Sequence, residues 1–389
     1  MSEKLAIAHI IASADLGWGG PSRVIREMTA ALADRGHRVV VFSTDAAPGR
    51  VRASASMQAP FDPRVEHRVF RSDLVRPPFP SAAMALAVVR EARGFDIAHV
   101  HGLFNAPSSA ALLALRAARV PFVVRPCGML DPWSLQQRAG VKAAWWRYLD
   151  GPSVRAAGAV QCSTPHELRS VEAALAQALG SRHPRLVECP QGVGLLPAPN
   201  EASAPHPRPY ILFLGRIAEK KGLLPLVRAI AQPTAPDCDL VVVGPSEHGH
   251  AREVSAAITQ LGLGGRVHLV GPIFDGAAKA RWYEHALAFA LPSSDENFGI
   301  TLVEAARHGV PLLVSPEVGL AEAIAHDGAG LVVKPLPDSI AAGLTVLVGP
   351  GREAFRAGAI RLGARFAWPE RAAQLESVYR EVLAEAGRR

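Results

Sequence analysis

Two hydrophobic patterns alternate along the chain. Short runs of apolar, often β-branched residues are separated by longer stretches in which apolar residues recur every three or four positions. The short runs are typical of buried strands in a parallel sheet, and the longer stretches are typical of the helices that cover it. In the first half we expect a helix over 21–35, and we expect strands over 5–12, 38–43, 96–101, 121–124 and 158–163.

The same alternation resumes after Asn200–Pro209, a segment of Ala, Pro, Ser and His that is typical of a linker. The strands expected there cover 210–215, 239–244, 266–271, 288–292, 312–315 and 330–333. A last helical pattern covers 370–386. We therefore predict an α/β fold with two Rossmann-like domains, 1–200 and 201–365, and a C-terminal segment over 366–389. Ligands bind such sheets at the carboxyl ends of their strands, so we expect the two halves to face each other across a binding cleft.

The composition fits two globular domains. The chain has 389 residues, 49% of them hydrophobic and 20% charged, which is enough for two cores at roughly 150 residues per domain. No apolar stretch approaches the roughly 20 residues that span a bilayer, and the N-terminus is unlike a signal peptide. We therefore expect a soluble cytoplasmic protein. The cysteines lie far apart, as reduced thiols do, and not as in a disulfide framework or zinc site: Cys127, Cys162, Cys189 and Cys238.

The net charge of +7 is carried by the first half of the chain. Residues 1–200 hold 23 Lys and Arg against 15 Asp and Glu, whereas residues 201–389 hold 19 against 20. Two interpretations stay open: the first half meets an anionic membrane or acceptor, or it has an Arg-rich solvated surface. The basic residues are dispersed and are not interleaved with aromatic residues, which argues against nucleic-acid binding.

Two loops combine glycine or basic residues with the end of an expected strand. Gly17-Trp18-Gly19-Gly20 lies between a strand and a helix, where glycines and a helix N-terminus let an anion approach the backbone. Its spacing matches neither the dinucleotide nor the Walker pattern, and a structural turn is the alternative. Arg216 and Lys221 follow the strand at 210–214, where two cations can neutralise a diphosphate. The alternative for this second loop is a solvated basic surface.

A third motif is more specific because two carboxylates flank a helix start. Glu296 is expected in the loop after a strand, and Glu304 is expected about one turn into the following helix. Carboxylates suit the hydroxyl groups of a sugar and a ribose, and a helix N-terminus suits phosphate. The two carboxylates are expected to face one ligand, with these backbone N–H donors between them: Phe298, Gly299, Ile300 and Thr301.

With these three motifs, the chain resembles the retaining glycosyltransferases of family four, which have the GT-B architecture of two facing Rossmann-like domains. Phe366-Ala367-Trp368, ahead of the final helix, is also similar to that family. The resemblance implies that the second domain holds a nucleoside diphosphate sugar and that the first receives the acceptor. It further implies that the last helix returns to the first domain, and that the donor is a substrate with no separate cofactor or metal.

The resemblance also implies roles for single residues. Arg216 and Lys221 would bind the diphosphate, Glu304 the ribose hydroxyls and Glu296 the donor sugar, and Gly19-Gly20 would approach the phosphate. Of these, Glu296, Arg216 and Lys221 are the catalytic candidates. In the family, the usual proposal is that the leaving group departs and the acceptor attacks on the same face, with the leaving phosphate taking the acceptor proton.

The chain departs from the family pattern at one position on the acceptor side. Many relatives have a histidine after the strand at 121–124, and here the run is Arg125-Pro126-Cys127-Gly128. Cys127 is thus either an acceptor-side residue or a small buried thiol. His101, which ends another strand, is either a substitute for the missing histidine or a packing residue.

The function implied is transfer of a hexose-type sugar, with retention, from a nucleoside diphosphate sugar to a hydroxyl group on a saccharide or lipid-linked acceptor. Relatives of the subgroup build cell-surface polysaccharide or lipopolysaccharide on the cytoplasmic face of the membrane. A basic first domain is compatible with peripheral contact with anionic lipid there. Two alternatives stay open: another GT-B reaction, such as epimerisation or sugar-phosphate synthesis, and a weakly active or inactive subunit that binds the nucleotide-sugar.

Overall fold

The chain folds into two compact units. A computed structural model describes residues 3–49, 51–52, 60–74, 76–179, 183–199, 201–247 and 249–387. The first unit comprises Met1–Gly192 with Trp368–Arg389, and the second comprises Val193–Ala367. The sequence placed the boundaries at 200/201 and 365/366. The segment 193–200 therefore groups with the second unit and not with the first. Among the described helices, none is long and apolar enough to cross a membrane.

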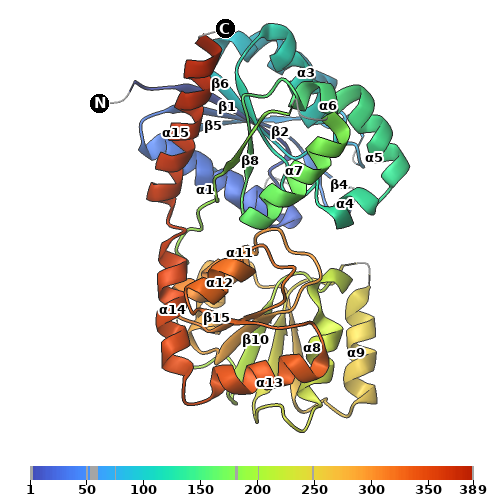
Figure 1. Ribbon diagram of the computed structural model, residues 1–389, viewed down its shortest axis with the longest axis vertical. Helices are drawn as coiled ribbons and strands as arrows, with labels where there is room; N and C mark the ends of the chain where they lie inside the picture. The colour runs from blue at the N-terminus through green and yellow to red at the C-terminus, as the bar shows by residue number, and fades with distance from the viewer. Residues whose placement is uncertain are drawn as a thin grey trace. The chain divides into compact units, whose positions relative to one another are not determined.

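The first unit is built on a seven-stranded sheet in the order β5-β2-β1-β6-β7-β8-β9, in which every neighbouring pair is parallel (Figure 1). The central strands are buried on both faces, so they read as continuous apolar runs. The strands are β1 (Ala6–Ser13), β2 (Arg38–Thr44), β5 (Val65–Phe70), β6 (Ile97–His101), β7 (Phe122–Arg125), β8 (Ala159–Cys162) and β9 (Arg185–Glu188), with a separate small pair β3 (Ala46–Ala47) and β4 (Val51–Arg52).

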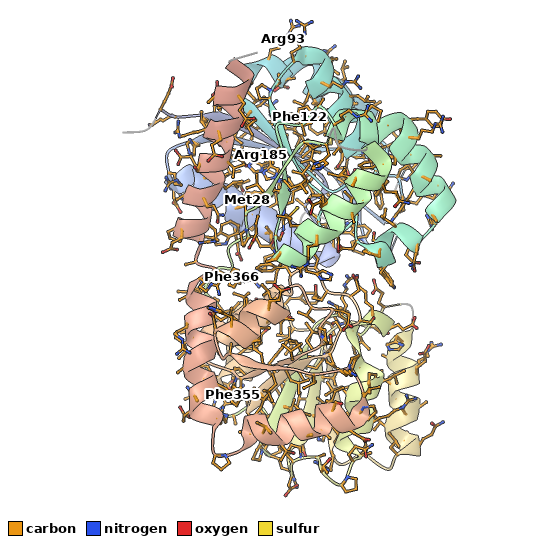
Figure 2. The ribbon with its side chains drawn as sticks, viewed as in Figure 1. Met28, Arg93, Phe122, Arg185, Phe355 and Phe366 are labelled. Atoms are coloured by element: carbon orange, nitrogen blue, oxygen red, sulfur yellow. The ribbon has the colours of Figure 1, made fainter. Side chains whose placement is uncertain are left out.

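Helices cover both faces of this sheet. One core cluster joins Phe122 and its face of the sheet to α2, α3, α6 and α7, and Met28 of α1 is buried outside that cluster (Figure 2). The C-terminal helix α15 packs beside α1 (Figure 1), and Arg35 Nε lies 2.6 Å from Glu376 Oε2. The helices are α1 (Gly20–Asp34), α2 (Ala82–Glu91), α3 (Ala106–Ala118), α4 (Pro132–Gln136), α5 (Ala139–Trp145), α6 (Gly151–Val154), α7 (Pro165–Leu179) and α15 (Trp368–Gly387).

The second unit repeats the architecture with six parallel strands in the order β12-β11-β10-β13-β14-β15. This is the Rossmann order, and its direction of strand addition reverses between β10 and β13. The strands are β10 (Tyr210–Leu214), β11 (Asp239–Val243), β12 (Val267–Gly271), β13 (Ala288–Leu291), β14 (Leu312–Val314) and β15 (Gly330–Val332). The helices are α8 (Leu223–Ile230), α9 (His250–Gln260), α10 (Gly276–Glu284), α11 (Ile300–Arg307), α12 (Ala321–His326), α13 (Pro337–Val348) and α14 (Arg352–Ala364).

The strands expected from the sequence are all present, and each end agrees with the prediction or differs from it by one residue. The predicted fold class is therefore confirmed, including the return of the last helix to the first unit. Four of the described strands were not predicted: the small pair β3 and β4, and the strands β5 and β9 at the two edges of the first sheet. These edge strands are only partly buried and contain charged residues, so they lack the continuous apolar run that marks a central strand.

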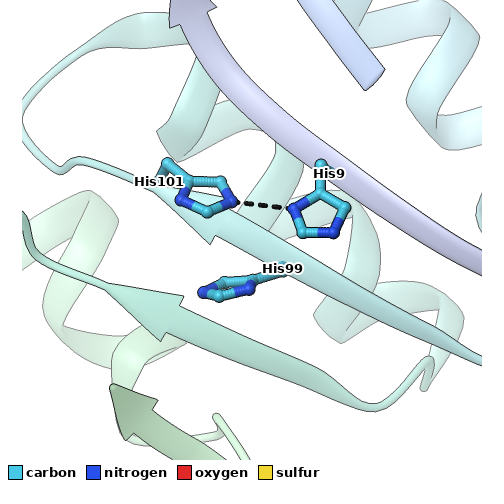
Figure 3. A group of neighbouring side chains, drawn as sticks. All are labelled: His9, His99 and His101. Atoms are coloured by element: carbon cyan, nitrogen blue, oxygen red, sulfur yellow. Dashed lines mark hydrogen bonds between the residues drawn. The ribbon is translucent and has the colours of Figure 1, made fainter. Parts of the chain in front are cut away.

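A cluster of three buried histidines lies on the face of the first sheet that meets α15. His9 of β1 and His99 and His101 of β6 lie together in Figure 3, and His9 Nδ1 is 3.0 Å from His101 Nε2. His99 Nδ1 is 2.7 Å from the hydroxyl of Tyr379 on α15. Burial lowers the pKa of His9 to about 3 and holds the pKa of the other two well below the usual value. The cluster is therefore neutral in the folded protein.

We expect these histidines to make the first unit less stable in mild acid. Below pH 6.5 the histidines of the unfolded chain bind protons, whereas the buried imidazoles of the folded protein stay neutral. The free energy of unfolding therefore falls as the pH falls. Each buried neutral histidine should lower the free energy of unfolding by about 2 kcal/mol between about pH 7 and 5. His9→Gln should remove the part of this loss that comes from His9. Denaturant unfolding at the two pH values measures the difference. The exposed control His326→Gln should leave it nearly unchanged, and a His9→Gln protein with the full wild-type loss would contradict the assignment.

Candidate functional site in the second unit

The loops after β10 and β13 pack against each other at the point where strand addition reverses. Backbone N–H of Ser294 donates to the carbonyl of Lys220 over 2.8 Å. Gly222 has φ +69°, and a Cβ added there would lie only 1.9 Å from the carbonyl oxygen of Pro292. Such a close approach of two backbones requires glycine at this position. Ligands of Rossmann-like sheets bind where adjacent strands end and their connections diverge, so this is the expected place for a site.

Two ion pairs join these loops. Lys221 Nζ pairs with Glu296 Oε2, and Lys220 Nζ lies 2.8 Å from Asp295 Oδ2. The Lys221 and Glu296 side chains are only 13% and 16% exposed, so little water screens their charges. The structure thus brings together two of the three predicted catalytic residues, which are 75 positions apart in sequence.

The protonation of Glu296 is set by its cationic neighbours. Burial acts to raise the pKa of its carboxyl, but the charges of Lys221, Lys220 and Arg216 outweigh burial and hold the pKa below the usual value. The carboxylate is therefore ionised at neutral pH. An ionised carboxylate accepts hydrogen bonds, which suits a role in orienting sugar hydroxyl groups.

Arg216, the third predicted catalytic residue, is also at this end of the sheet. Its Nη1 lies 2.5 Å from Glu247 Oε1, and the arginine side chain is 47% exposed. Glu247 follows β11, whose carboxyl end lies beside that of β10. Glu247 and Lys220 were not among the predicted site residues, although both lie in loops that follow strand ends.

The N-terminus of α11 presents backbone donors close to Glu296 in sequence. Gly299 is the N-cap residue of α11, with φ 80°, so the helix begins where the sequence predicted. The N–H groups of Ile300 and Thr301 belong to the first turn, where a helix leaves donors without intrahelical partners. The Phe298 side chain is buried, and its ring meets that of Phe366 edge-on at 5.3 Å. Phe298 thus offers only its backbone to a ligand.

Glu304 differs from its predicted surroundings. Its carboxylate has no exposed surface: Oε1 lies 2.9 Å from Lys279 Nζ, and Oε2 accepts a hydrogen bond of 2.8 Å from the Tyr283 hydroxyl. Both partners come from α10, which the sequence analysis did not connect to the site. Glu304 and Glu296 therefore pair with different lysines, and the expectation that both face one ligand stays a prediction. For Glu304 to reach a ribose, the Lys279 ammonium must move aside, and this role stays a prediction.

The glycine loop of the first unit is built around its own hydrogen bonds. Asp15 Oδ1 accepts from the N–H of Gly17 over 2.8 Å, and the Trp18 indole N–H donates to the Ala46 carbonyl over 3.1 Å. Gly19, at φ 81°, caps α1, and Gly20 is its first residue. The predicted loop and helix start are therefore present, in a conformation that also serves as a structural turn.

The two acceptor-side candidates have different surroundings. His101 is buried within the histidine cluster, which fits a packing role, and its role as a substitute for the missing histidine stays a prediction. Cys127 has φ 58°, which is uncommon for a residue other than glycine. Its thiol is 3.5 Å from the Arg125 carbonyl, and burial raises its pKa, so it is not a reactive thiolate at neutral pH.

Family models match both units. Residues 19–192 match the family described as "Glycosyl transferase 4-like domain", and residues 198–350 match "Glycosyl transferases group 1". The chain belongs to the GT4-type glycosyltransferases.

Two curated relatives of this glycosyltransferase have the same name. The chain is 37% identical over 179 residues to the D-inositol 3-phosphate glycosyltransferase of Jonesia denitrificans, a match that covers 43% of this chain and 42% of the relative. It is 28% identical over 402 residues to the enzyme of the same name from Xylanimonas cellulosilytica, which covers 93% of this chain and 91% of the relative. The chain thus spans about two fifths of the first relative and nearly all of the second.

Solved structures share the fold of this glycosyltransferase over nearly its whole length. Sucrose-phosphate synthase from Thermosynechococcus elongatus has a TM-score of 0.75 at 23% identity, over 98% of this chain and all of that one. Anabaena Alr3699/HepE, in complex with UDP and glucose, scores 0.73 at 18% identity, over 96% and 98%. WaaG, a glycosyltransferase involved in lipopolysaccharide biosynthesis, scores 0.67 at 17% identity, over 95% and 99%. These likenesses establish the GT-B fold.

We expect Gly222→Ala to destabilise the second unit of this glycosyltransferase. The new methyl group would meet the Pro292 carbonyl, and the residue would keep an unfavourable positive φ, at a total cost of at least about 2 kcal/mol. Gly215→Ala in the same loop is the matched control, because a Cβ there meets no atom within 4 Å. Equal free energies of unfolding for the two variants would show that the close approach is not required.

Proposed function

We propose that this glycosyltransferase moves a hexose-type sugar, with retention of anomeric configuration, from a nucleoside diphosphate sugar to a hydroxyl group of the acceptor. The observation that carries the proposal is the pairing of Lys221 with Glu296 beside the N-terminus of α11, at the reversal point of a Rossmann-like sheet. This arrangement supports the proposal because cations, backbone donors and an ionised carboxylate lie where such folds bind nucleotides.

The chemistry follows from where charge develops during transfer. Breaking the bond between the anomeric carbon and the phosphate oxygen builds negative charge on the diphosphate and positive character on the sugar. In our proposal Lys221, Arg216 and the α11 N–H groups stabilise the departing diphosphate, without a resident cofactor or divalent metal. Glu296 orients the sugar hydroxyls, and the leaving phosphate takes the proton of the attacking acceptor on the same face. The contribution that the resemblance implies for Gly19 and Gly20 is kept as part of this proposal.

A UDP-hexose is the first donor to test. The support comes from Anabaena Alr3699/HepE, a structural neighbour described with UDP and glucose. Ribose binding by Glu304 belongs to the same proposal, and it requires Lys279 to exchange the carboxylate for a new partner such as a donor phosphate. That exchange is electrostatically reasonable because a phosphate is also an anion.

For the acceptor we propose a saccharide or lipid-linked saccharide in the assembly of cell-surface polysaccharide or lipopolysaccharide. WaaG, described as taking part in lipopolysaccharide biosynthesis, supports this choice by fold alone. A phosphorylated inositol is the second candidate, because the relative from Xylanimonas cellulosilytica aligns over 93% of the chain and is named for that substrate. Direct comparison of the two acceptor classes with one donor separates them.

Two alternatives to sugar transfer by this chain can be distinguished by experiment. Cys127 stands where many relatives have a histidine, which favours a weakly active or inactive subunit that still binds the nucleotide-sugar. A different GT-B reaction, such as epimerisation, predicts conversion of the donor without any acceptor. Donor binding without transfer supports the first alternative, and conversion of the donor alone supports the second.

We expect Lys221→Ala and Glu296→Ala to lower transfer by at least about 100-fold, because the first removes a cation that stabilises the departing diphosphate and the second removes the carboxylate that orients the sugar. Product formation from a UDP-hexose measures the loss, and circular dichroism checks that each variant is folded. Lys334→Ala removes an exposed lysine of the same unit and serves as the control. Turnover equal to wild type in either site variant would remove that residue from the mechanism.

We further propose a cytoplasmic protein that attaches peripherally to membranes through the basic first unit. Residues 1–200 carry 23 basic against 15 acidic side chains, and each basic residue near an anionic surface contributes about 1 kcal/mol. Vesicle sedimentation should therefore show binding that requires anionic lipid and weakens as salt is raised. Vesicle binding that does not change with salt concentration, or no binding to anionic vesicles, would contradict electrostatic attachment to the membrane.

A further inference from the structure

Two imidazoles and a carboxylate converge at the amino-terminal edge of the second sheet. His206 Nε2 lies 2.8 Å from Asp239 Oδ2, and His268 Nε2 lies 3.0 Å from the same oxygen. The two histidine rings are 4.6 Å apart between centroids. His206 precedes β10, Asp239 begins β11, and His268 lies near the start of β12. Three neighbouring chain segments thus direct one ligand atom each to a single point.

We propose that His206, Asp239 and His268 form a site for a divalent transition-metal ion of the zinc class. Two imidazole nitrogens, a carboxylate oxygen and water are a common ligand set for Zn²⁺. A tetrahedral ion with bonds of about 2.0–2.1 Å holds its ligand atoms about 3.3 Å apart. The observed spacings are a few tenths of an ångström shorter, so small outward shifts of the rings make room for the ion.

In the metal-free arrangement, each histidine Nε2 forms a hydrogen bond with Asp239 Oδ2. An ion takes the place of the two shared hydrogens and requires an Nε2 without a proton, so that Nδ1 carries the ring hydrogen. Asp239 stays a carboxylate throughout. The ion therefore replaces two hydrogen bonds with coordination bonds to the same three groups.

The protein holds the ligands firmly on one side and leaves them open on the other. The Asp239 side chain is 2% exposed and that of His206 is 12% exposed, whereas the His268 side chain is 33% exposed. Tyr210, which is buried, meets the His206 ring edge-on at 5.8 Å. Solvent and an ion thus reach the cluster from the His268 side, and water can complete the coordination.

Neighbouring charges favour a cation here. Arg208 Nε lies 3.1 Å from Asp239 Oδ1, and another nitrogen of the same guanidinium lies 2.7 Å from Asp237. Arg208 is thus shared by two carboxylates. The nearby Arg266 donates to the backbone carbonyls of Pro236 and Cys238 instead. Arg208 also fixes the orientation of the Asp239 carboxylate, as partners of metal ligands commonly do.

The three buried histidines of the first unit provide a comparison (Figure 3). His9, His99 and His101 also lie close enough to share an ion, but no carboxylate belongs to that cluster. The charge of Arg125 lowers the pKa of His99 and His101, and it disfavours a metal cation there in the same way. A buried ion without a compensating carboxylate is costly. We therefore assign the metal to the second unit only.

The proposed metal site is separate from the site proposed for the sugar donor. β11 is five residues long, so the two edges of the sheet are about 16 Å apart at about 3.3 Å per residue. Asp239 starts this strand, and the loop with Glu247 follows its end. The metal is thus expected to stabilise the unit from the edge opposite Lys221, without touching the donor.

Titration calorimetry with ZnCl₂ on the full chain, free of any affinity tag and stripped with a chelator, tests the proposal. We expect one ion per chain with a dissociation constant at or below about 10 μM. His268→Gln, and separately His206→Gln, should weaken binding by at least about tenfold. The control His326→Gln removes an exposed histidine that lies 2.9 Å from Asp327, and it should bind zinc as wild type does.

A second readout separates lost binding from lost folding. Co²⁺ bound in place of Zn²⁺ should give the visible absorption of a low-coordinate site in wild type and in the control, but not in either site variant. A thermal-unfolding shift with UDP should be the same in wild type and His268→Gln, which shows that the variant is folded and its donor site intact. Wild-type binding weaker than 10 μM, or unchanged zinc affinity in both folded variants, would overturn the assignment.

Discussion

The close packing of the loop after β10 on the loop after β13 is the constraint on which the site of the second unit depends. Only glycine at position 222 lets the two backbones approach so closely. The approach places Lys221 against Glu296, and Lys220 against Asp295, although each pair is separated by 75 residues. Four charged groups are thereby gathered at one end of the sheet, beside the start of α11. The cations keep Glu296 ionised despite its burial.

Other buried polar groups in the two units are likewise either paired with partners or neutral. Glu304 is buried between Lys279 and Tyr283, and Asp239 accepts from two histidines, so each carboxylate has partners that offset its loss of water. In the first unit the corresponding reversal point, between β1 and β6, carries His9 and His101 instead, which stay neutral. The two sheets add their first strands in the same order, and at this point the second sheet carries the ion pairs of Lys221 and Lys220.

Much of this architecture could be predicted from sequence because the central strands are buried on both faces. Tyr210–Leu214, for example, reads as an unbroken apolar run. The edge strands β5 and β9 contain no such apolar run, and they were not predicted. The meeting of Lys221 and Glu296 followed from the rule that ligand loops cluster at strand ends. The partners of Glu304 could not be predicted from this rule, because Lys279 and Tyr283 lie within a helix. No local spacing in the sequence indicates which helix covers a given carboxylate.

A crystal structure of the chain with a bound UDP-hexose tests the central claim most directly. The account predicts that the diphosphate oxygens lie within hydrogen-bond distance of Lys221 Nζ and the N–H groups of Ile300 and Thr301. The sugar hydroxyls should then contact the carboxylate of Glu296, whose lysine partner has turned toward the phosphate. A donor bound elsewhere in the protein, with Lys221 still paired to Glu296, would contradict the account.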